Sequence, residues 1–142
     1  MRNSIRRSMW IVVALGLFAS HASAEVVVIV NPKNPAASLT AQQVAALYLG
    51  TATTFPSGGP VAMVDQPEGT GIRGAFYEKA TGRTVAQVRA TWARITFTGK
   101  GMPPKELKSD ADVKAFVAAD PKAIGYVDAS AVDASVKAVL TL

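Results

Sequence analysis

The sequence predicts an α/β fold in a single domain, because strand-like and helix-like stretches alternate along it. The β-branched run Val26–Val30 is typical of a strand buried on both faces. Serine and threonine residues stand where amphipathic stretches begin, as helix caps do. With 49% hydrophobic and 18% charged residues, the 142-residue chain has the composition of a globular protein.

The first 24 residues have the pattern of a cleaved secretory signal peptide. Three arginines within the first seven residues precede a short apolar stretch at 9–19. That stretch is too short to span a membrane, which needs about 20 apolar residues. Ala-Ser-Ala at 22–24 forms a small-residue cleavage site that makes Glu25 the new N-terminus. The sequence therefore predicts an exported, periplasmic protein consisting of one domain, residues 25–142.

Composition excludes several function classes. The chain has no cysteine, and its one histidine, His21, lies in the predicted signal peptide. Cysteine nucleophiles, Ser-His-Asp triads and Cys/His zinc sites are therefore excluded. After removal of the signal peptide, twelve basic residues face ten acidic ones, and no basic run is interleaved with aromatic residues as nucleic-acid binding requires. We expect a protein that is not an enzyme, holds no metal or cofactor, and binds no nucleic acid.

The first strand, Val26–Val30, is ended by Asn31 and Pro32. A helix then begins after Thr40, which forms a capping box with Gln43 three residues later. The inward face of this helix and its terminating glycine are Val44, Leu47, Tyr48 and Gly50.

A proline- and glycine-rich turn at 56–60 leads into a second strand at 61–65. The chain then passes through a Gly-rich turn at 66–71 into a helix that ends at Gly82. One face of this helix carries Ile72, Phe76 and Ala80.

Thr84 caps a third helix, and an irregular loop at 98–104 follows it. Ser109 then starts a fourth helix. The residues expected to face inward from these two helices are Val85, Val88, Trp92 and Ile95, and Val113, Phe116 and Val117.

Two strands complete the domain, a short one at 124–127 and a C-terminal one at 136–142. The C-terminal stretch alternates, with Lys137, Val139 and Thr141 on one side and the more apolar set on the other, which favours an edge strand. That second set is Val136, Ala138, Leu140 and Leu142.

The segment from Asp65 to Phe76 carries the most chemical information. A strand enters a Gly-rich turn and then the first turn of a helix, where free backbone N–H groups and the helix dipole favour an anion. Gly69 and Gly71 allow the backbone to approach a ligand closely, and the Thr70 hydroxyl adds a hydrogen-bonding group. The residues alone also fit a plain helix start without a ligand.

Several segments, in order, resemble the phosphate-binding proteins of ABC transporters, which have the type II periplasmic-binding-protein fold. They are Leu39–Gly50, the Gly-Thr-Gly turn up to Phe76, Trp92–Gly99, Pro103–Pro104 and Ile124–Val127. The resemblance covers nearly all of residues 25–142 and is strongest to short bacterial members about one lobe long. It implies a single three-layer lobe with a mixed sheet flanked by helices.

The resemblance also implies which residues bind the ligand. The family turn reads Arg-x-x-x-Ser-Gly-Thr, and alignment on Phe76 places Gln66, Thr70, Gly71 and Ile72 at its Arg, Ser, Gly and Thr positions. A charge and a hydroxyl donor are therefore absent, which weakens oxyanion binding. The expected contacts are Gly69, Thr70, Gly71 and the Ile72 backbone, with Gln66, Arg73, Ser38 and Asn31 as helpers; Arg73 is equally compatible with a solvated surface position.

These observations leave two hypotheses open. In the first, the protein binds phosphate or a similar oxyanion for ABC-type uptake or sensing, with a transporter permease or membrane sensor as partner. A second copy of the chain would then supply the wall that the other lobe provides in full-length members. In the second, the lobe binds no ligand and contacts a sensor, a transporter or another copy of itself.

Overall fold

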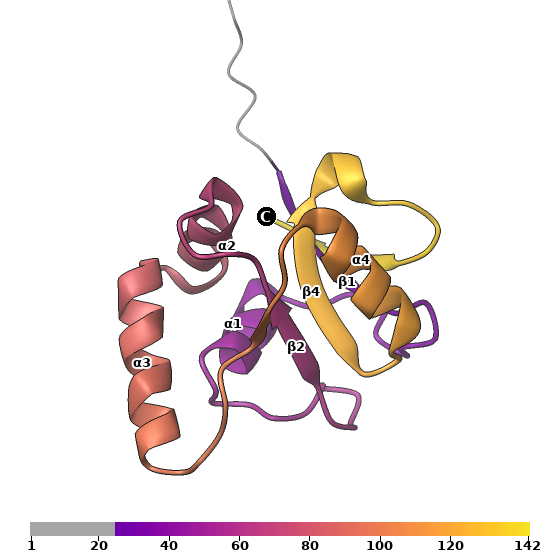
Figure 1. The fold of residues 1–142 in the computed structure, drawn as a ribbon. Coiled ribbons are helices and arrows are strands. Elements are labelled where there is room, and N and C mark those ends of the chain that lie inside the picture. The colour runs from indigo at the N-terminus through magenta and orange to yellow at the C-terminus, as the bar shows by residue number, and fades with distance from the viewer. Residues whose placement is uncertain (1–24) are drawn as a thin grey trace, which may run out of the picture.

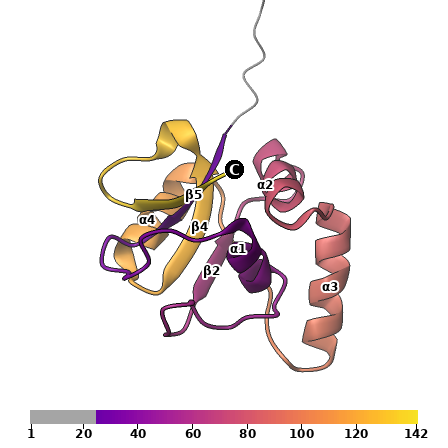
Figure 2. The same cartoon turned by 180° about the vertical axis from the view of Figure 1, so that it is seen from behind.

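The computed structural model describes residues 25–142, so the predicted signal peptide, with His21, lies outside the described residues. Five strands form one mixed sheet in the order β3-β2-β4-β1-β5. Figure 1 labels β1, β2 and β4, and Figure 2 labels β5. Strand β1 is antiparallel to β4 and β5, whereas β2 is parallel to β3 and β4. The elements are β1 (Val26–Val30), α1 (Ala41–Tyr48), β2 (Ala62–Asp65), α2 (Gly71–Thr81), α3 (Val85–Phe97), β3 (Lys105–Glu106), α4 (Asp110–Ala119), β4 (Ala123–Asp128), the 3-10 turn Ala129–Ala131 and β5 (Lys137–Thr141).

Helices cover both faces of the sheet, which confirms the predicted three-layer α/β lobe. Helices α1 and α2 lie on one face with α3 packed beside them, and α4 lies on the other face, as Figures 1 and 2 show from opposite sides. Strand β1 is buried on both sides, because Val26, Val28 and Val30 belong to the first cluster and Val27 and Ile29 to the second. The continuous β-branched run therefore predicted its environment correctly.

The predicted helix starts are confirmed in detail. Thr40 and Gln43 form a reciprocal capping box at α1, and Thr84 begins α3 in the same way. Ser109 accepts the Asp112 N–H at the start of α4. Of the apolar positions predicted to face inward from the helices, four are only half-buried: Ile72, Val85, Ile95 and Phe116.

Two features of the sheet differ from the prediction. Strand β3 was not expected, because its two exposed residues carry no apolar pattern and pair only with the end of β2. In β5, Val139 is buried and Ala138 exposed, the reverse of the predicted alternation. The register shifts between Val28 and Ile29, which pair with Leu140 and Ala138, so Val139 is an extra residue that turns inward.

Gly125 marks the tightest packing between the sheet and α4. A Cβ atom there would lie 2.7 Å from Val113 Cγ1 and 2.9 Å from Val64 Cγ2. We expect Gly125→Ala to lower the free energy of unfolding by about 1–3 kcal/mol through overpacking. Urea denaturation followed by circular dichroism measures this change.

The matched control is Gly74→Ala, within α2, where a Cβ atom would meet nothing within 4 Å. This variant should gain up to about 1 kcal/mol of stability, because alanine favours a helix over glycine. Changes in stability of opposite sign are therefore expected at the two glycines; a Gly125→Ala protein as stable as wild type would contradict the tight packing.

No helix within residues 25–142 is both long and apolar enough to cross a bilayer.

Candidate functional site

The candidate site is the junction between the carboxyl end of β2 and the start of α2. Strand β2 ends at Asp65, and a turn leads to Gly71, the first residue of α2. Gly69 has φ +84°, in the left-handed region that favours glycine. Gly69, Thr70 and Gly71 are all exposed, so the start of α2 is open to solvent.

Helix α2 begins without a side-chain cap, unlike the other three α-helices in residues 25–142. Thr40, Thr84 and Ser109 each accept an N–H of the helix they precede. The Thr70 hydroxyl instead donates to Pro67 O at 2.7 Å. The first backbone N–H groups of α2 therefore have no side-chain acceptor, and they carry the positive end of the helix dipole.

Gln66 is buried and its amide is used within the protein. Its Nε2 donates to Asp110 Oδ1 at 2.7 Å and to Tyr126 O at 3.1 Å. Both amide hydrogens are thereby occupied, and the residue is only 2% exposed. The residue at the family's arginine position thus ties β2 to α4 and β4 and holds no donor toward the start of α2.

Arg73 points from α2 toward the sheet edge. Its Nη1 donates to Gln66 O at 3.1 Å and to Glu106 Oε2 at 3.2 Å, while Nε lies 3.8 Å from Asp65 Oδ2 and makes no hydrogen bond. The guanidinium therefore faces two carboxylates and joins α2 to β2 and β3. These contacts indicate that the Arg73 charge holds α2 against the two strands and is not directed at a ligand.

Asp65 is the centre of a buried polar cluster that the sequence analysis did not predict. Its carboxylate accepts a hydrogen bond from Tyr77 Oη at 2.5 Å, another from Tyr126 Oη, and the Gln66 N–H at 2.9 Å. Burial, and then the negative charge of Asp65, raise the pKa of both tyrosines well above the ordinary value of 10. The cluster fixes the end of β2, from which the turn to α2 departs.

Tyr48 completes the cluster from α1. Its hydroxyl donates to Val64 O at 2.8 Å, and burial, followed by the charge of Asp65, raises its pKa. The Phe76 ring stacks on the Tyr126 ring with 3.8 Å between ring centroids, so an apolar side chain packs directly against the cluster. The expected inward position of Phe76 is confirmed, and Tyr77 is fully buried as well.

Asn31 and Ser38 do not join the other candidate residues. Because β1 is antiparallel to β4, and β4 parallel to β2, Asn31 lies at the opposite end of the sheet from Asp65. Its amide donates to the Val117 and Ala118 carbonyls, at the end of α4. Ser38 is exposed and precedes Leu39, which bonds to the edge strand β5, roughly 14 Å from β2 across three strand spacings.

A groove of about 520 Å³ lies between α3 and the loop before β3. Trp92, Phe97, Pro103 and Pro104 form its apolar wall, and Asp65 and Arg73 lie at its inner end. No group of three His, Cys, Asp or Glu side chains able to hold a metal ion occurs in residues 25–142.

No protein-family model and no curated protein matches the chain. Solved structures do match it. A protein of Clostridium perfringens, assigned as a phosphate ABC transporter substrate-binding protein and solved with bound phosphate, is 27% identical with a TM-score of 0.66. An ABC-type phosphate transport receptor of Vibrio cholerae is 23% identical with a TM-score of 0.63. The matches cover 82% of this chain but only 45% and 46% of those chains, respectively.

The chain thus spans about half the length of these neighbours and has the fold of one lobe, as the resemblance implied. The likeness extends to a protein of Planctomyces limnophilus described as a possible phosphate-binding protein, with 18% identity and a TM-score of 0.61. By their descriptions, the first two of these neighbours belong to ABC-type phosphate transport.

Proposed function

We propose that this chain binds phosphate or a similar small oxyanion at the start of α2, as an exported substrate-binding-type protein for ABC-type uptake or sensing. The observation that carries the proposal is the uncapped start of α2 in a lobe whose solved neighbours include a phosphate complex. Gly69 and Thr70 and the N–H groups of Gly71, Ile72 and Arg73 would contact the anion. Periplasmic location and a transporter partner belong to the same proposal.

The physical basis is electrostatic. The backbone N–H groups in the first turn of α2 have no acceptor within the helix, and the helix dipole places about half a positive charge there. An oxyanion would accept hydrogen bonds from these N–H groups. The side-chain oxygens of Thr40, Thr84 and Ser109 accept the corresponding hydrogen bonds at the other helices. Since Gln66 and Arg73 are engaged elsewhere, backbone groups supply most of the binding.

The direct test is isothermal titration of residues 25–142 with phosphate and then sulfate, after dialysis to remove carried-over anion. Saturable binding supports the proposal. No heat up to millimolar phosphate, from a protein that circular dichroism shows to be folded, would overturn it.

Thr70→Asp is expected to weaken phosphate binding about 100-fold while raising the melting temperature. The new carboxylate would accept hydrogen bonds from the free N–H groups of α2, and its negative charge would repel the anion. The same hydrogen bonds would stabilise the helix by about 1 kcal/mol. Titration and thermal denaturation of one preparation measure both effects.

Thr84→Asp is the matched control, because it makes the same change at the start of α3. It should leave phosphate binding unchanged. Equal binding by wild type and Thr70→Asp would place the anion elsewhere.

The second candidate function is an interaction module that binds no ligand. It is favoured by the internal contacts of Gln66 and Arg73, which engage the side-chain amide and the guanidinium expected to help hold an anion. Under this hypothesis, Thr70→Asp would leave partner binding intact and phosphate would give no heat.

A further inference from the structure

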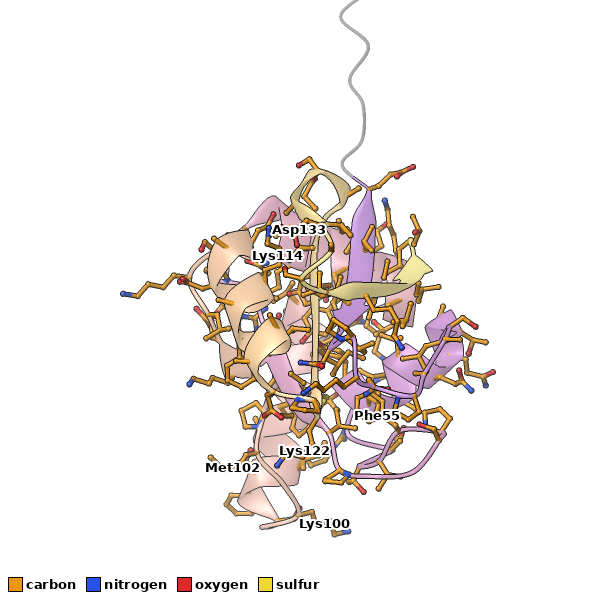
Figure 3. All side chains as sticks on the ribbon, turned by 90° about the vertical axis from the view of Figure 1, so that its right-hand side faces the viewer. Phe55, Lys100, Met102, Lys114, Lys122 and Asp133 are labelled. Carbon is orange, nitrogen blue, oxygen red and sulfur yellow. The ribbon has the colours of Figure 1, made fainter. Side chains whose placement is uncertain are left out.

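Residues 94–104, the α3 tip, comprise the last turn of α3 and the loop that follows it. The α3 tip carries Phe97, which is 92% exposed, and Met102, which is 76% exposed, the two large hydrophobic side chains that stand out in solvent within residues 25–142. Figure 3 shows Met102 and Lys100 at one extremity of the molecule, both pointing away from it. Neither hydrophobic side chain belongs to a core cluster.

The α3 tip is held in place by contacts that leave these side chains outside. Trp92 is buried and its Nε1 donates to Tyr48 O at 2.8 Å, which anchors α3 on the lobe. Beyond it, the Thr98 and Lys100 N–H groups close the end of the helix on the carbonyls of Arg94 and Ile95, each at 3.1 Å. The exposed side chains therefore belong to an ordered turn.

Positive charge is concentrated on a longer segment, residues 83–108, which contains the α3 tip with Arg94 and Lys100. Residues 83–108 hold six basic residues and one acidic residue, Glu106, whereas the rest of 25–142 holds six basic and nine acidic residues. All six basic side chains are exposed, and among them only Arg89 has an ion-pair partner, Glu68. The cations without a carboxylate partner are Arg83, Arg94, Lys100, Lys105 and Lys108.

We propose that the α3 tip docks onto an anionic phospholipid surface, with Phe97 and Met102 entering the interface and Arg94 and Lys100 contacting the headgroups. Exposed apolar side chains beside unpaired cations are the combination by which proteins bind the surface of a charged bilayer. The apolar groups gain burial, and each cation gains attraction to lipid phosphate. The proposal is independent of phosphate binding at α2.

The shape and charge of the α3 tip favour a lipid surface over a second copy of the chain. The tip is a protruding end of the molecule, away from residue 25 and the C-terminus (Figure 1), so it meets a flat surface without a matching cavity. A two-fold dimer through this surface would bring two net-positive segments together, and like charges in contact disfavour it.

The test is co-sedimentation with vesicles of equimolar phosphatidylcholine and phosphatidylglycerol, with pure phosphatidylcholine vesicles alongside. Residues 25–142 are used because they contain every element that the structure describes and both core clusters, and because they lack the apolar stretch 9–19. We expect binding to the anionic vesicles only, reversed by about 0.5 M salt as charges are screened. No binding to anionic vesicles, or equal binding to both kinds, would overturn the proposal.

Two variants probe the two parts of the contact. Phe97→Ser is expected to weaken vesicle binding at least about tenfold, through loss of a buried aromatic side chain. Lys100→Glu is expected to weaken it about twentyfold, through reversal of one charge near the surface. Because both side chains are exposed, neither change should lower the melting temperature.

Lys79→Glu is the charge-matched control, since Lys79 is exposed in the last turn of α2, the length of α3 away from the tip. It should leave vesicle binding within about twofold of wild type, and an effect as large as that of Lys100→Glu would overturn the proposal. So would a dimer, seen by sedimentation velocity without lipid, that Phe97→Ser dissociates.

The outcome is separable from that of the proposed function. Thr70→Asp should retain vesicle binding, and Phe97→Ser should retain phosphate binding. Loss of vesicle binding in Thr70→Asp would indicate that lipid phosphate is held at α2, which overturns docking through the α3 tip.

Discussion

Replacing Asp65 with alanine is expected to lower the free energy of unfolding by about 3–5 kcal/mol, enough to unfold much of a marginal domain. Removal of the carboxylate leaves the hydroxyls of Tyr77 and Tyr126, whose side chains are fully buried, without an acceptor. Arg73 also loses one of its two carboxylate neighbours. Guanidinium denaturation at neutral pH, followed by far-UV circular dichroism, measures the loss.

Two further variants make this expectation specific. Glu68→Ala removes a carboxylate that is half exposed and paired with Arg89, so it should cost at most about 1 kcal/mol. Asp65→Asn keeps one acceptor oxygen and should cost an intermediate amount, about 1–3 kcal/mol. If Asp65→Ala were no more damaging than Glu68→Ala, the buried cluster would not hold the end of β2.

The domain is expected to lose stability steeply above about pH 10, where tyrosines in the unfolded chain ionise. The pKa values of Tyr48, Tyr77 and Tyr126 are raised in the folded protein, first by burial and then by Asp65. Their contribution is therefore complete below pH 10 and is lost as the pH rises, because only the unfolded state releases the three protons. The free energy of unfolding should fall by about 4 kcal/mol per pH unit once all three ionise in the unfolded chain.

Urea denaturation at a series of alkaline pH values gives this slope directly. Tyr77→Phe removes one of the three groups and should reduce the slope by about one third. A slope unchanged by Tyr77→Phe would show that other groups cause the alkaline unfolding.

The local structure of this protein was largely predictable from its sequence. Capping at Thr40, Thr84 and Ser109 depends on a side chain and an N–H three residues later, so a short stretch of sequence contains the whole interaction. The run Val26–Val30 likewise predicted a strand with both faces buried. Because such signals depend on near neighbours, the element order and the α/β class followed from them.

The environment of the candidate site was not predictable in the same way. Gln66 was an expected ligand, yet its partners are Asp110, 44 residues away, and Tyr126, 60 residues away. Arg73 meets Glu106 because β3 pairs with β2, and the two-residue β3 gave no sequence signal. Local pattern places a residue on an element, but the partner of its side chain depends on which strands become neighbours.

The sequence by itself therefore determined the four helices, every strand except β3, the order of these elements, and the turn at Gly69, Thr70 and Gly71 that leads into α2. Only the tertiary structure decided that Asp65 is buried between two tyrosines, that Asn31 lies at the far end of the sheet, and that Val139 turns inward. The physical reason is the separation in sequence between the residues that interact. Caps and turns form between residues close in sequence, whereas burial, strand register and charge pairing arise only when distant segments pack together.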